Sequence, residues 1–317
     1  MIVVQGIEAI APGTFRAPVV TIGVFDGVHR GHRRVIARAR EIAAPLRGEV
    51  VVVTFHVHPR SVTVGVAPPL VTSLPHRLLL LEREGVDATV VLHFDETLRN
   101  MSAEQFVDDI LVARIGVRAL VLGHDSHFGK DRRGDFDLAR RLLAPRGVPV
   151  ERIEPVRLAD GRIVSSSSIR ASVAANEVAA SEELMGRPPA LYGTVVRGDG
   201  RGRTLGFPTA NLDLGGELRP PRGVYGASVA IDGRAWPAVV NIGGRPTFHP
   251  EGDAADTVEV HVIGFAGDLY GRALEVRVFG RIRDERRFAG ADELKTQIAA
   301  DVEEMRGHVR RGEWKVG

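Results

Sequence analysis

Residues 23–32 of this 317-residue chain read GVFDGVHRGH, and this stretch decides the fold of the first half. It follows an apolar run at 19–24 that predicts a buried strand. It precedes residues 33–44, whose apolar side chains recur at helical spacing before Pro45. A glycine-rich turn between a strand and a helix presents backbone N–H groups to a ligand, which is how proteins hold phosphate. We therefore expect a phosphate-binding turn that includes Gly23, Phe25, Asp26 and Gly27.

Two histidines stand at the expected start of this helix. His29 and His32 are three residues apart, so both rings would face the same side. Two imidazoles at an anion-binding helix end suit the stabilisation of a phosphoryl group that gains charge in its transition state. Two alternatives are an ordinary turn with surface histidines, and a zinc site shared with His56 and His58. The glycine-rich context favours phosphate, and we expect His29 and His32 to be catalytic.

Composition excludes several classes of function. With 42 basic and 40 acidic residues, no broad attraction to nucleic acid or to a membrane is expected. The absence of cysteine excludes disulfides, thiolate metal sites and cysteine nucleophiles, and it fits a reducing cytoplasm. The N-terminus lacks the basic start of a signal peptide, and no apolar stretch approaches the ~20 residues that span a bilayer. We expect a cytoplasmic protein.

The first half alternates strand and helix signals. Continuous apolar runs with helical segments between them indicate a doubly wound parallel sheet, an α/β fold with helices on both faces. Ligands of such sheets bind at the carboxyl ends of the strands. The expected strands are 19–24, 49–55, 88–94 and 119–123, and the expected helices are 33–44, 75–84, 102–115 and 135–143.

The pattern changes after the sequence GRPP at 186–189. Glycine followed by prolines ends a helix, so we place a domain boundary there and expect domains at 1–185 and 186–317. Helical segments at 169–175 and 178–185 precede the boundary. Short apolar runs beyond it predict an antiparallel β-barrel, and an apolar stripe predicts a terminal helix at 292–310. The runs lie at 190–197, 224–231, 236–242, 257–263 and 273–282.

Two further segments of the first half are candidate binding sites. Residues 165–170 read SSSSIR, and their hydroxyls and guanidinium could hold an anion at a helix start, with Ser165, Ser166 and Arg170 as phosphate contacts. A simple serine N-cap is the alternative. The polar loop at 123–135 follows an expected strand and suits a second substrate, although a solvated charged turn would look the same.

The second half holds a glycine-rich segment at 193–211. Glycines let the backbone approach a nucleotide, and arginines add positive charge. Thr209 and Asn211 supply hard oxygen atoms suited to Mg²⁺ on a phosphate. A glycine-rich hairpin with basic tips is the alternative. The expected ATP contacts are Gly193, Gly200, Gly202, Arg203 and Pro208.

The strand at 257–262 alternates in polarity. Its three valines face one side, and Thr257, Glu259 and His261 face the other. If the polar face lines a cleft, Glu259 is a candidate general base for a substrate hydroxyl. If that face meets water, these residues are ordinary strand exterior.

Taken together, these motifs resemble the bacterial bifunctional riboflavin kinase/FMN adenylyltransferase family, also called FAD synthetase. The resemblance covers nearly the whole chain, and the order of its motifs is specific to the bifunctional enzyme. In the first half it is carried by GVFDGVHRGH, TFHVHP at 54–59, the loop at 123–135 and SSSSIR. In the second half it is carried by RGRTLGFPTANL at 201–212, PPRGVYG at 220–226, VNIGGRPTF at 240–248, VEVH at 258–261 and DLYG at 268–271.

The resemblance implies two activities. The first domain would join the AMP of ATP to FMN, releasing pyrophosphate and FAD, and the barrel would phosphorylate riboflavin with Mg²⁺–ATP. It places flavin near His58, Pro59, Gly123 and Asp125 in the first domain, and near Arg283, Glu285 and Phe288 in the second. The expected partners are therefore riboflavin, FMN and ATP, with no nucleic acid or membrane, and no oligomeric state is assigned.

Two other functions are compatible with parts of the sequence. The chain could keep one activity, with the other domain a flavin-binding or regulatory remnant. Alternatively, the barrel could bind single-stranded RNA, as small barrels often do. Aromatic residues make up only 5% of the chain and do not interleave with a basic stripe, which argues against RNA.

Overall fold

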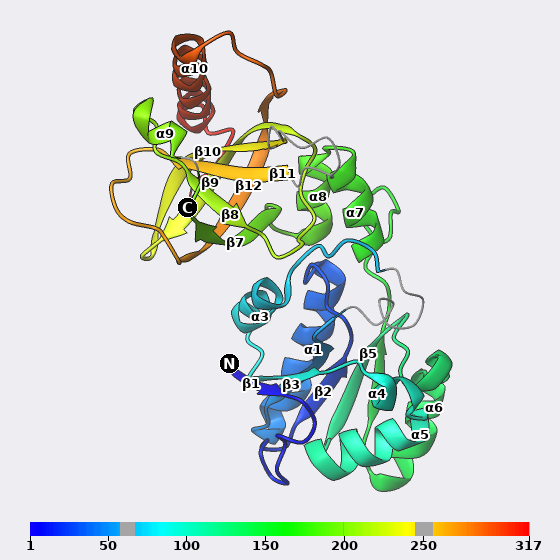
Figure 1. Cartoon of the computed structure of the whole chain (residues 1–317). Helices are drawn as coiled ribbons and strands as arrows, with labels where there is room; N and C mark the ends of the chain where they lie inside the picture. Colours follow the sequence, from blue (N-terminus) through cyan, green and yellow to red (C-terminus); the bar gives the residue numbers. More distant parts are fainter. Residues whose placement is uncertain (58–66, 199, 245–255, 317) are drawn as a thin grey trace. The chain divides into compact units, whose positions relative to one another are not determined.

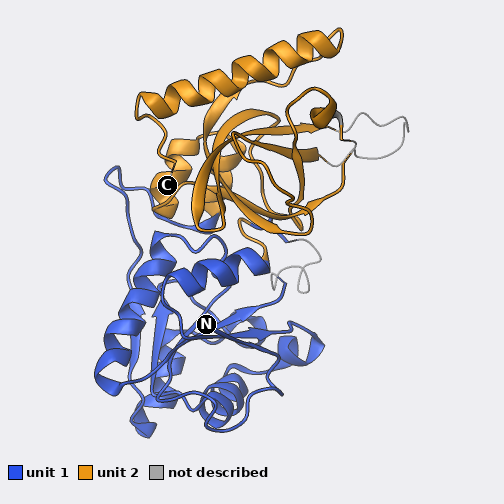
Figure 2. Cartoon of the chain, turned by 90° about the vertical axis from the view of Figure 1, so that its left-hand side faces the viewer, with its two compact units in different colours: residues 1–70, 74–166 blue, residues 71–73, 167–317 orange. Residues whose placement is uncertain are grey.

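The computed structural model describes residues 1–57, 67–198, 200–244 and 256–316 (Figure 1). The chain forms two compact units (Figure 2). The first comprises Met1–Leu70 and Leu74–Ser166, and the second comprises Val71–Ser73 and Ser167–Gly317. Helix α8 (Val178–Met185) and all but the first residue of α7 (Ser166–Ala174) therefore group with the second unit. The functional boundary expected at Gly186 stays a prediction.

A parallel sheet forms the centre of the first unit, as the continuous apolar runs predict. Within the described residues it has six strands, and their order is β1-β4-β3-β2-β5-β6. The two edge strands were not predicted, because β1 is short and mostly exposed and β6 carries Glu151 and Arg152. The strands are β1 (Ile2–Gln5), β2 (Val19–Ile22), β3 (Val50–Phe55), β4 (Ala88–Leu92), β5 (Ala119–Gly123) and β6 (Val150–Ile153).

Helices cover both faces of this sheet, which confirms the doubly wound prediction. Helices α1 (Arg30–Leu46) and α3 (Leu74–Arg83) share one core cluster with Val50 and Val52. The segment η1 (Phe106–Ile115) and α6 (Phe136–Leu143) share another with Val51 and Val53. Alternate residues of one strand thus face opposite layers. The shorter helices are α4 (Glu96–Asn100), α5 (Ala103–Gln105), η2 (Lys130–Arg132) and η3 (Ala144–Arg146).

Two expected helices differ from the structure. Helix α1 does not stop before Pro45 but includes it and ends at Leu46, followed by the C-cap residue Arg47, which has a left-handed φ of 49°. Proline removes one backbone donor, and in the last turn that loss does not end the helix. The helix expected at 102–115 is α-helical only at its start, where Ser102 and Gln105 form a capping box, and it continues as the π-helix η1. Apolar spacing does not distinguish these two windings.

The second unit is built on a closed barrel, which confirms the expected antiparallel architecture. Its strand order is β10-β11-β8-β7-β12-β9. Val258, Val260 and Val262 point into the apolar interior, so Glu259 and His261 lie on the outer surface. Strand β8 was not predicted, because Ala210 and Leu212 are the only apolar residues among its four. The strands are β7 (Ala190–Val196), β8 (Ala210–Asp213), β9 (Gly223–Ile231), β10 (Arg234–Gly244), β11 (Asp256–Val262) and β12 (Ala273–Arg283).

Besides α7 and α8, the described part of the second unit contains two further helices. The short helix α9 (Arg201–Thr204) lies within the glycine-rich segment. The terminal helix α10 (Ala291–Arg310) packs Val302 and Met305 against Val224 and Val239 on the outside of the barrel. This apolar stripe was predicted from the sequence, and it fixes α10 beside strands β9 and β10.

Candidate functional site

The turn after β2 has an unusual backbone. Phe25, Gly27 and Val28 all have positive φ angles, of 53°, 85° and 37°. Glycine adopts this region freely, but a β-branched valine does so only under strain of about 1–3 kcal/mol. Such strain is typical of ligand-binding turns, where the backbone must aim N–H groups at one point. Residues 25–29 are buried, which holds the turn in this shape.

The two histidines meet at the N-terminus of α1. His29 is the N-cap residue, and its Nδ1 accepts a hydrogen bond of 3.3 Å from the backbone N–H of His32. The two rings are stacked, with centroids 3.6 Å apart and planes 16° apart. The spacing of three residues therefore brings both imidazoles together, as expected. Because a helix N-terminus favours negative charge, the pair stands where an anion is stabilised.

The serine-rich segment meets this turn. Ser166 Oγ donates a 2.9 Å hydrogen bond to the carbonyl oxygen of Asp26. A Cβ added to Gly31 would lie 3.7 Å from the carbonyl oxygen of Val164 and 3.1 Å from the His29 ring, so the two segments pack closely. Ser166 begins α7, and Arg170 follows one turn later on the same helix face. Two motifs predicted to bind phosphate are thus joined.

The loop after β5 is anchored by one aromatic side chain. Phe128 is buried against Phe106, with ring centroids 5.5 Å apart, and its backbone exchanges two hydrogen bonds with Gly134. The predicted contact residues Gly123 and Asp125 precede this anchor, and the Asp125 side chain is exposed. The loop therefore has a fixed base and an open polar tip.

On the barrel, three polar residues form a row across adjacent strands. Glu259 of β11 pairs in register with Asn241 of β10 on one side and with Asn211 of β8 on the other. The interior valines of β11 set this row on the outer face. Asn241 was not among the predicted site residues, and strand register is the signal that identifies it.

Glycines of residues 198–202 make room for the candidate metal ligands. A Cβ on Gly198 would collide with the side-chain amide of Asn211. A Cβ on Gly202 would collide with the carbonyl of Phe207 and lie 3.0 Å from Thr209 Oγ1. These glycines therefore bring the backbone against the two oxygen donors, an arrangement that fits a Mg²⁺ ion carrying phosphate oxygens.

Other predicted nucleotide contacts have different surroundings. Gly193 lies within β7, where a Cβ would lie 2.5 Å from the Asp213 carbonyl of β8, so strand packing accounts for this glycine. Gly200 occupies a turn with a φ of 69° and open space around it. Arg203 is exposed. The carbonyl of Pro208 accepts a 2.9 Å hydrogen bond from His261 Nδ1, which ties β11 to this segment.

The three residues predicted to flank flavin on the barrel differ in their contacts. Glu285 lies against Gly243, where a Cβ would collide with its carboxylate and lie 3.3 Å from Asn241 Nδ2. This places Glu285 beside the row that contains Glu259. Arg283 instead binds the buried Asp301 of α10 through two hydrogen bonds of 2.8 Å. Its guanidinium carbon also lies 5.7 Å from the centre of the Phe288 ring.

Some of the predicted residues belong neither to the turn with His29 and His32 nor to the row with Glu259. His58 and Pro59 lie outside the described residues. The zinc alternative gains no support, because the described residues contain no group of three or more His, Cys, Asp or Glu side chains that could hold a metal ion. His56 stacks on His93 instead, at a centroid distance of 5.6 Å.

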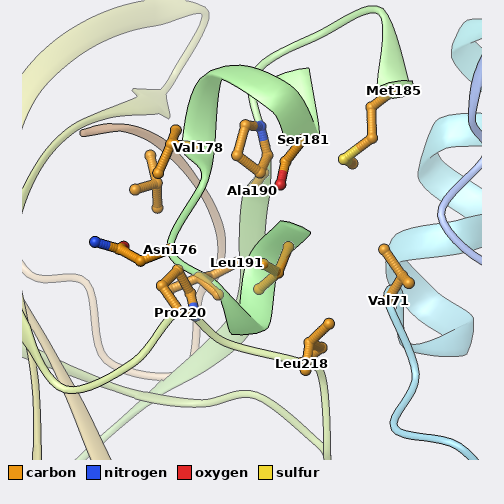
Figure 3. Close-up of a pocket in the computed structure, with 12 residues that line it drawn as sticks. Val71, Asn176, Val178, Ser181, Met185, Ala190, Leu191, Leu218 and Pro220 are labelled. Atoms are coloured by element: carbon orange, nitrogen blue, oxygen red, sulfur yellow. The ribbon is translucent and has the colours of Figure 1, made fainter. Parts of the chain in front are cut away.

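A small pocket in the second unit contains none of the predicted site residues (Figure 3). Apolar side chains of α7, α8 and β7 line it, and Asn176 and Ser181 are its polar members. The space that water could enter measures about 20 Å³. This is room for about one water molecule, so the pocket does not suit a substrate.

Known protein families match both halves of the chain. The FAD synthetase family matches residues 12–168, and the riboflavin kinase family matches residues 185–309. The chain belongs to the bifunctional riboflavin kinase/FMN adenylyltransferase family. The relative from Pseudomonas fluorescens is 44% identical over 302 residues, covering 95% of this chain and 96% of that protein. The relative from Escherichia coli K12 is 37% identical, covering 95% and 96%.

A solved structure has a similar fold. It is described as a macrolide-efflux protein from Streptococcus pneumoniae, and it matches with a TM-score of 0.79 at 29% identity, covering 96% of this chain and 99% of that one. The word efflux belongs to the description of that solved protein and is not applied to this chain. The family assignment rests on the sequence relatives. In the part of this chain that is described, no helix is both long and apolar enough to cross a membrane.

Proposed function

We propose that this bifunctional riboflavin kinase/FMN adenylyltransferase performs its two reactions at two separate sites. FMN is adenylylated at the turn that holds His29 and His32, in a functional domain spanning 1–185. Riboflavin is phosphorylated on the barrel beside Glu259, in a domain spanning 186–317. The observation that carries the proposal is that the motif residues of each half converge, through the Ser166–Asp26 hydrogen bond in one half and the Asn211–Glu259–Asn241 register in the other. A cytoplasmic location belongs to this proposal.

At the first site the protein positions the reactants and stabilises charge. The turn at 23–28 and the start of α1 bind the phosphates of ATP through backbone N–H groups. His29 and His32 stabilise the α-phosphate while a phosphate oxygen of FMN attacks it and pyrophosphate leaves. Ser165, Ser166 and Arg170 hold the leaving phosphates, and the loop around Gly123 and Asp125 contacts flavin.

At the second site Glu259 is the general base. An alcohol is a poor nucleophile at neutral pH, so the terminal hydroxyl of riboflavin transfers its proton to the carboxylate as its oxygen bonds to the γ-phosphorus of ATP. The bond from that phosphorus to the bridging oxygen breaks at the same time, and ADP leaves. Asn241 lies opposite Glu259 in the strand register, Glu285 lies near Asn241, and both orient the hydroxyl-bearing chain. Thr209 and Asn211 would hold Mg²⁺, which would neutralise charge on the phosphates of ATP.

A time course with the purified full-length chain tests the proposal. Riboflavin, ATP and Mg²⁺ are incubated with the protein, and the flavins are separated at intervals. FMN is expected first and FAD later, and excess chelator should prevent both. A chain that forms neither flavin over a range of ATP and metal concentrations would overturn the proposal. Formation of FMN alone, with added FMN left unchanged, would show that the chain has only the riboflavin kinase activity.

A further inference from the structure

Arg77 of α3 is a buried cation that the proposed mechanism does not use. Its side chain is fully buried, with a relative exposure of 0%. Arginine is almost never fully buried unless a partner compensates its charge. Burial lowers the pKa of the Arg77 guanidinium from its ordinary value, and the charge of Asp26 opposes part of that shift. The complete burial of the Arg77 guanidinium therefore needs a physical explanation.

Within the described residues, the hydrogen bonds of Arg77 come from only one of its three guanidinium nitrogen atoms. Its Nη1 donates to Thr54 Oγ1 at 3.0 Å and to the carbonyl of Phe55 at 3.1 Å. Its Nε and Nη2 have no hydrogen-bond partner in the structure as far as it is described. A guanidinium offers five N–H groups, and buried donors without partners are costly. A methionine or leucine would fill the same space without this cost, so filling the core does not explain Arg77.

The bonds that Arg77 does make lead to the phosphate turn. Thr54 Oγ1, which accepts from Arg77, donates in turn to the carbonyl of Val24 at 3.1 Å. Val24 immediately precedes the segment with positive φ angles at Phe25, Gly27 and Val28. Arg77 thus braces the end of β3, and through Thr54 it fixes the start of the strained turn. Asp26, whose charge acts on Arg77, belongs to the same turn.

We propose that Arg77 is a positioning residue for adenylyl transfer, which holds the turn at 24–28 through Thr54 and places a buried positive charge behind it. The inference rests on the proposed function of this turn. A turn held in the wrong shape would still bind ATP but would misplace its N–H groups and His29 relative to the reacting phosphate. Misplacement of about 1 Å can cost on the order of 10²-fold in rate. The effect therefore falls on kcat rather than on KM.

Four variants of the full-length chain test this role. Arg77→Met removes the charge and the donors at similar length, Arg77→Lys keeps the charge, and Thr54→Val removes only the relay hydroxyl. Arg83→Met, on the exposed side of the same helix, is the matched control. The measurements are kcat and KM for ATP in FAD formation from supplied FMN, FMN formation from riboflavin, and the thermal unfolding midpoint.

The expected result is a loss confined to one activity. In Arg77→Met, kcat for FAD formation should fall roughly 100-fold, with KM for ATP changed less than about threefold and FMN formation unchanged. In Arg77→Lys, kcat for FAD formation should be about tenfold higher than in Arg77→Met. Thr54→Val should lower the same kcat, and it decides the question if Arg77→Met does not fold. Arg83→Met should behave as the wild type.

Three results would overturn the inference. The first is a normal kcat for FAD formation in Thr54→Val and in Arg77→Met. The second is a loss shared equally by both activities, and the third is a loss that Arg77→Lys does not relieve at all, because either of these would indicate a merely structural role. A wild-type chain that adenylylates no FMN would overturn the proposed function itself. Wild-type FAD formation with unaffected variants would remove only the inference about Arg77.

Discussion

The hydroxyl of Ser166 donates a 2.9 Å hydrogen bond to the backbone carbonyl of Asp26, although 140 residues separate them in the sequence. This single bond joins the glycine-rich turn after β2 to the serine-rich start of α7. Two segments that the sequence predicts to bind phosphate are thereby held together. The first prediction follows from this contact.

Ser166→Ala removes the hydrogen bond to the Asp26 carbonyl. A neutral hydrogen bond contributes about 0.5–1.5 kcal/mol, which corresponds to roughly twofold to thirteenfold in rate. FAD formation from FMN should therefore fall by at least that factor, whereas FMN formation should not change. The neighbouring exposed Ser167, replaced by alanine, serves as the control. Equal rates in the two variants would show that the Ser166–Asp26 bond is not needed for the reaction.

Glu259→Gln keeps the size of the side chain on β11 and removes its basicity. General-base assistance is typically worth ~10²–10⁴-fold, so turnover in riboflavin phosphorylation should fall by about that range while riboflavin binding changes little. Steady-state kinetics with riboflavin as the varied substrate measures both quantities. FAD formation from supplied FMN is the internal control. A kinase turnover near that of the wild type would mean that Glu259 is only a polar strand residue.

Asp301→Asn breaks the pair that fastens α10 to the end of β12. Arg283 binds both carboxylate oxygens of Asp301, which is only 2% exposed. Removing one partner of a buried pair typically costs about 3–5 kcal/mol, because the other charge stays buried. Chemical denaturation should show a loss of this size in the free energy of unfolding. FMN formation should also fall, because α10 and Phe288 adjoin Arg283.

The control for that prediction is a second arginine–aspartate pair of the barrel. Arg272 also contacts both oxygens of Asp232, but Asp232 is exposed, and such pairs contribute little. Asp232 has a left-handed φ of 51°, which asparagine adopts readily, so Asp232→Asn adds no backbone strain. Equal destabilisation by the two substitutions would contradict the role given to Asp301.

Two fragments test whether the stable second unit starts at residue 167 or at residue 186. Helices α7 and α8 group with the barrel, and side chains from both line its pocket. A fragment covering 167–317 should therefore unfold at a higher temperature than one covering 186–317, although both should phosphorylate riboflavin. Circular dichroism during heating measures the difference. Identical midpoints would show that α7 and α8 add nothing to the stability of the barrel.

The sequence predicts the elements whose pattern is local and regular. The turn at 23–32, the buried strands β2 to β5 and the apolar stripe of α10 all appear where their patterns place them. Edge strands such as β1 have weak patterns, because one side faces solvent. The π-helical winding of η1 depends on how its side chains pack in three dimensions.

Site residues also divide into those that a local sequence motif predicts and those that only three-dimensional packing identifies. His29, His32 and Ser166 stand in motifs that can be recognised without a structure, and the structure brings them together. Asn241 becomes a candidate only when the register of β10 against β11 is known. Arg77 lies in the helical segment 74–83 and gives no sign of its contacts with Thr54 and Phe55, because those depend on how α3 packs on the sheet.

The central claim is that one chain holds two independent active sites, and a double substitution tests it most directly. The variant with His29→Ala and His32→Ala is assayed twice in a single preparation, for FAD formation from FMN and for FMN formation from riboflavin. We predict that the first activity is lost and that the second continues at the wild-type rate, with FMN accumulating. A folded variant that loses both activities, or one that still forms FAD at the normal rate, would contradict the claim.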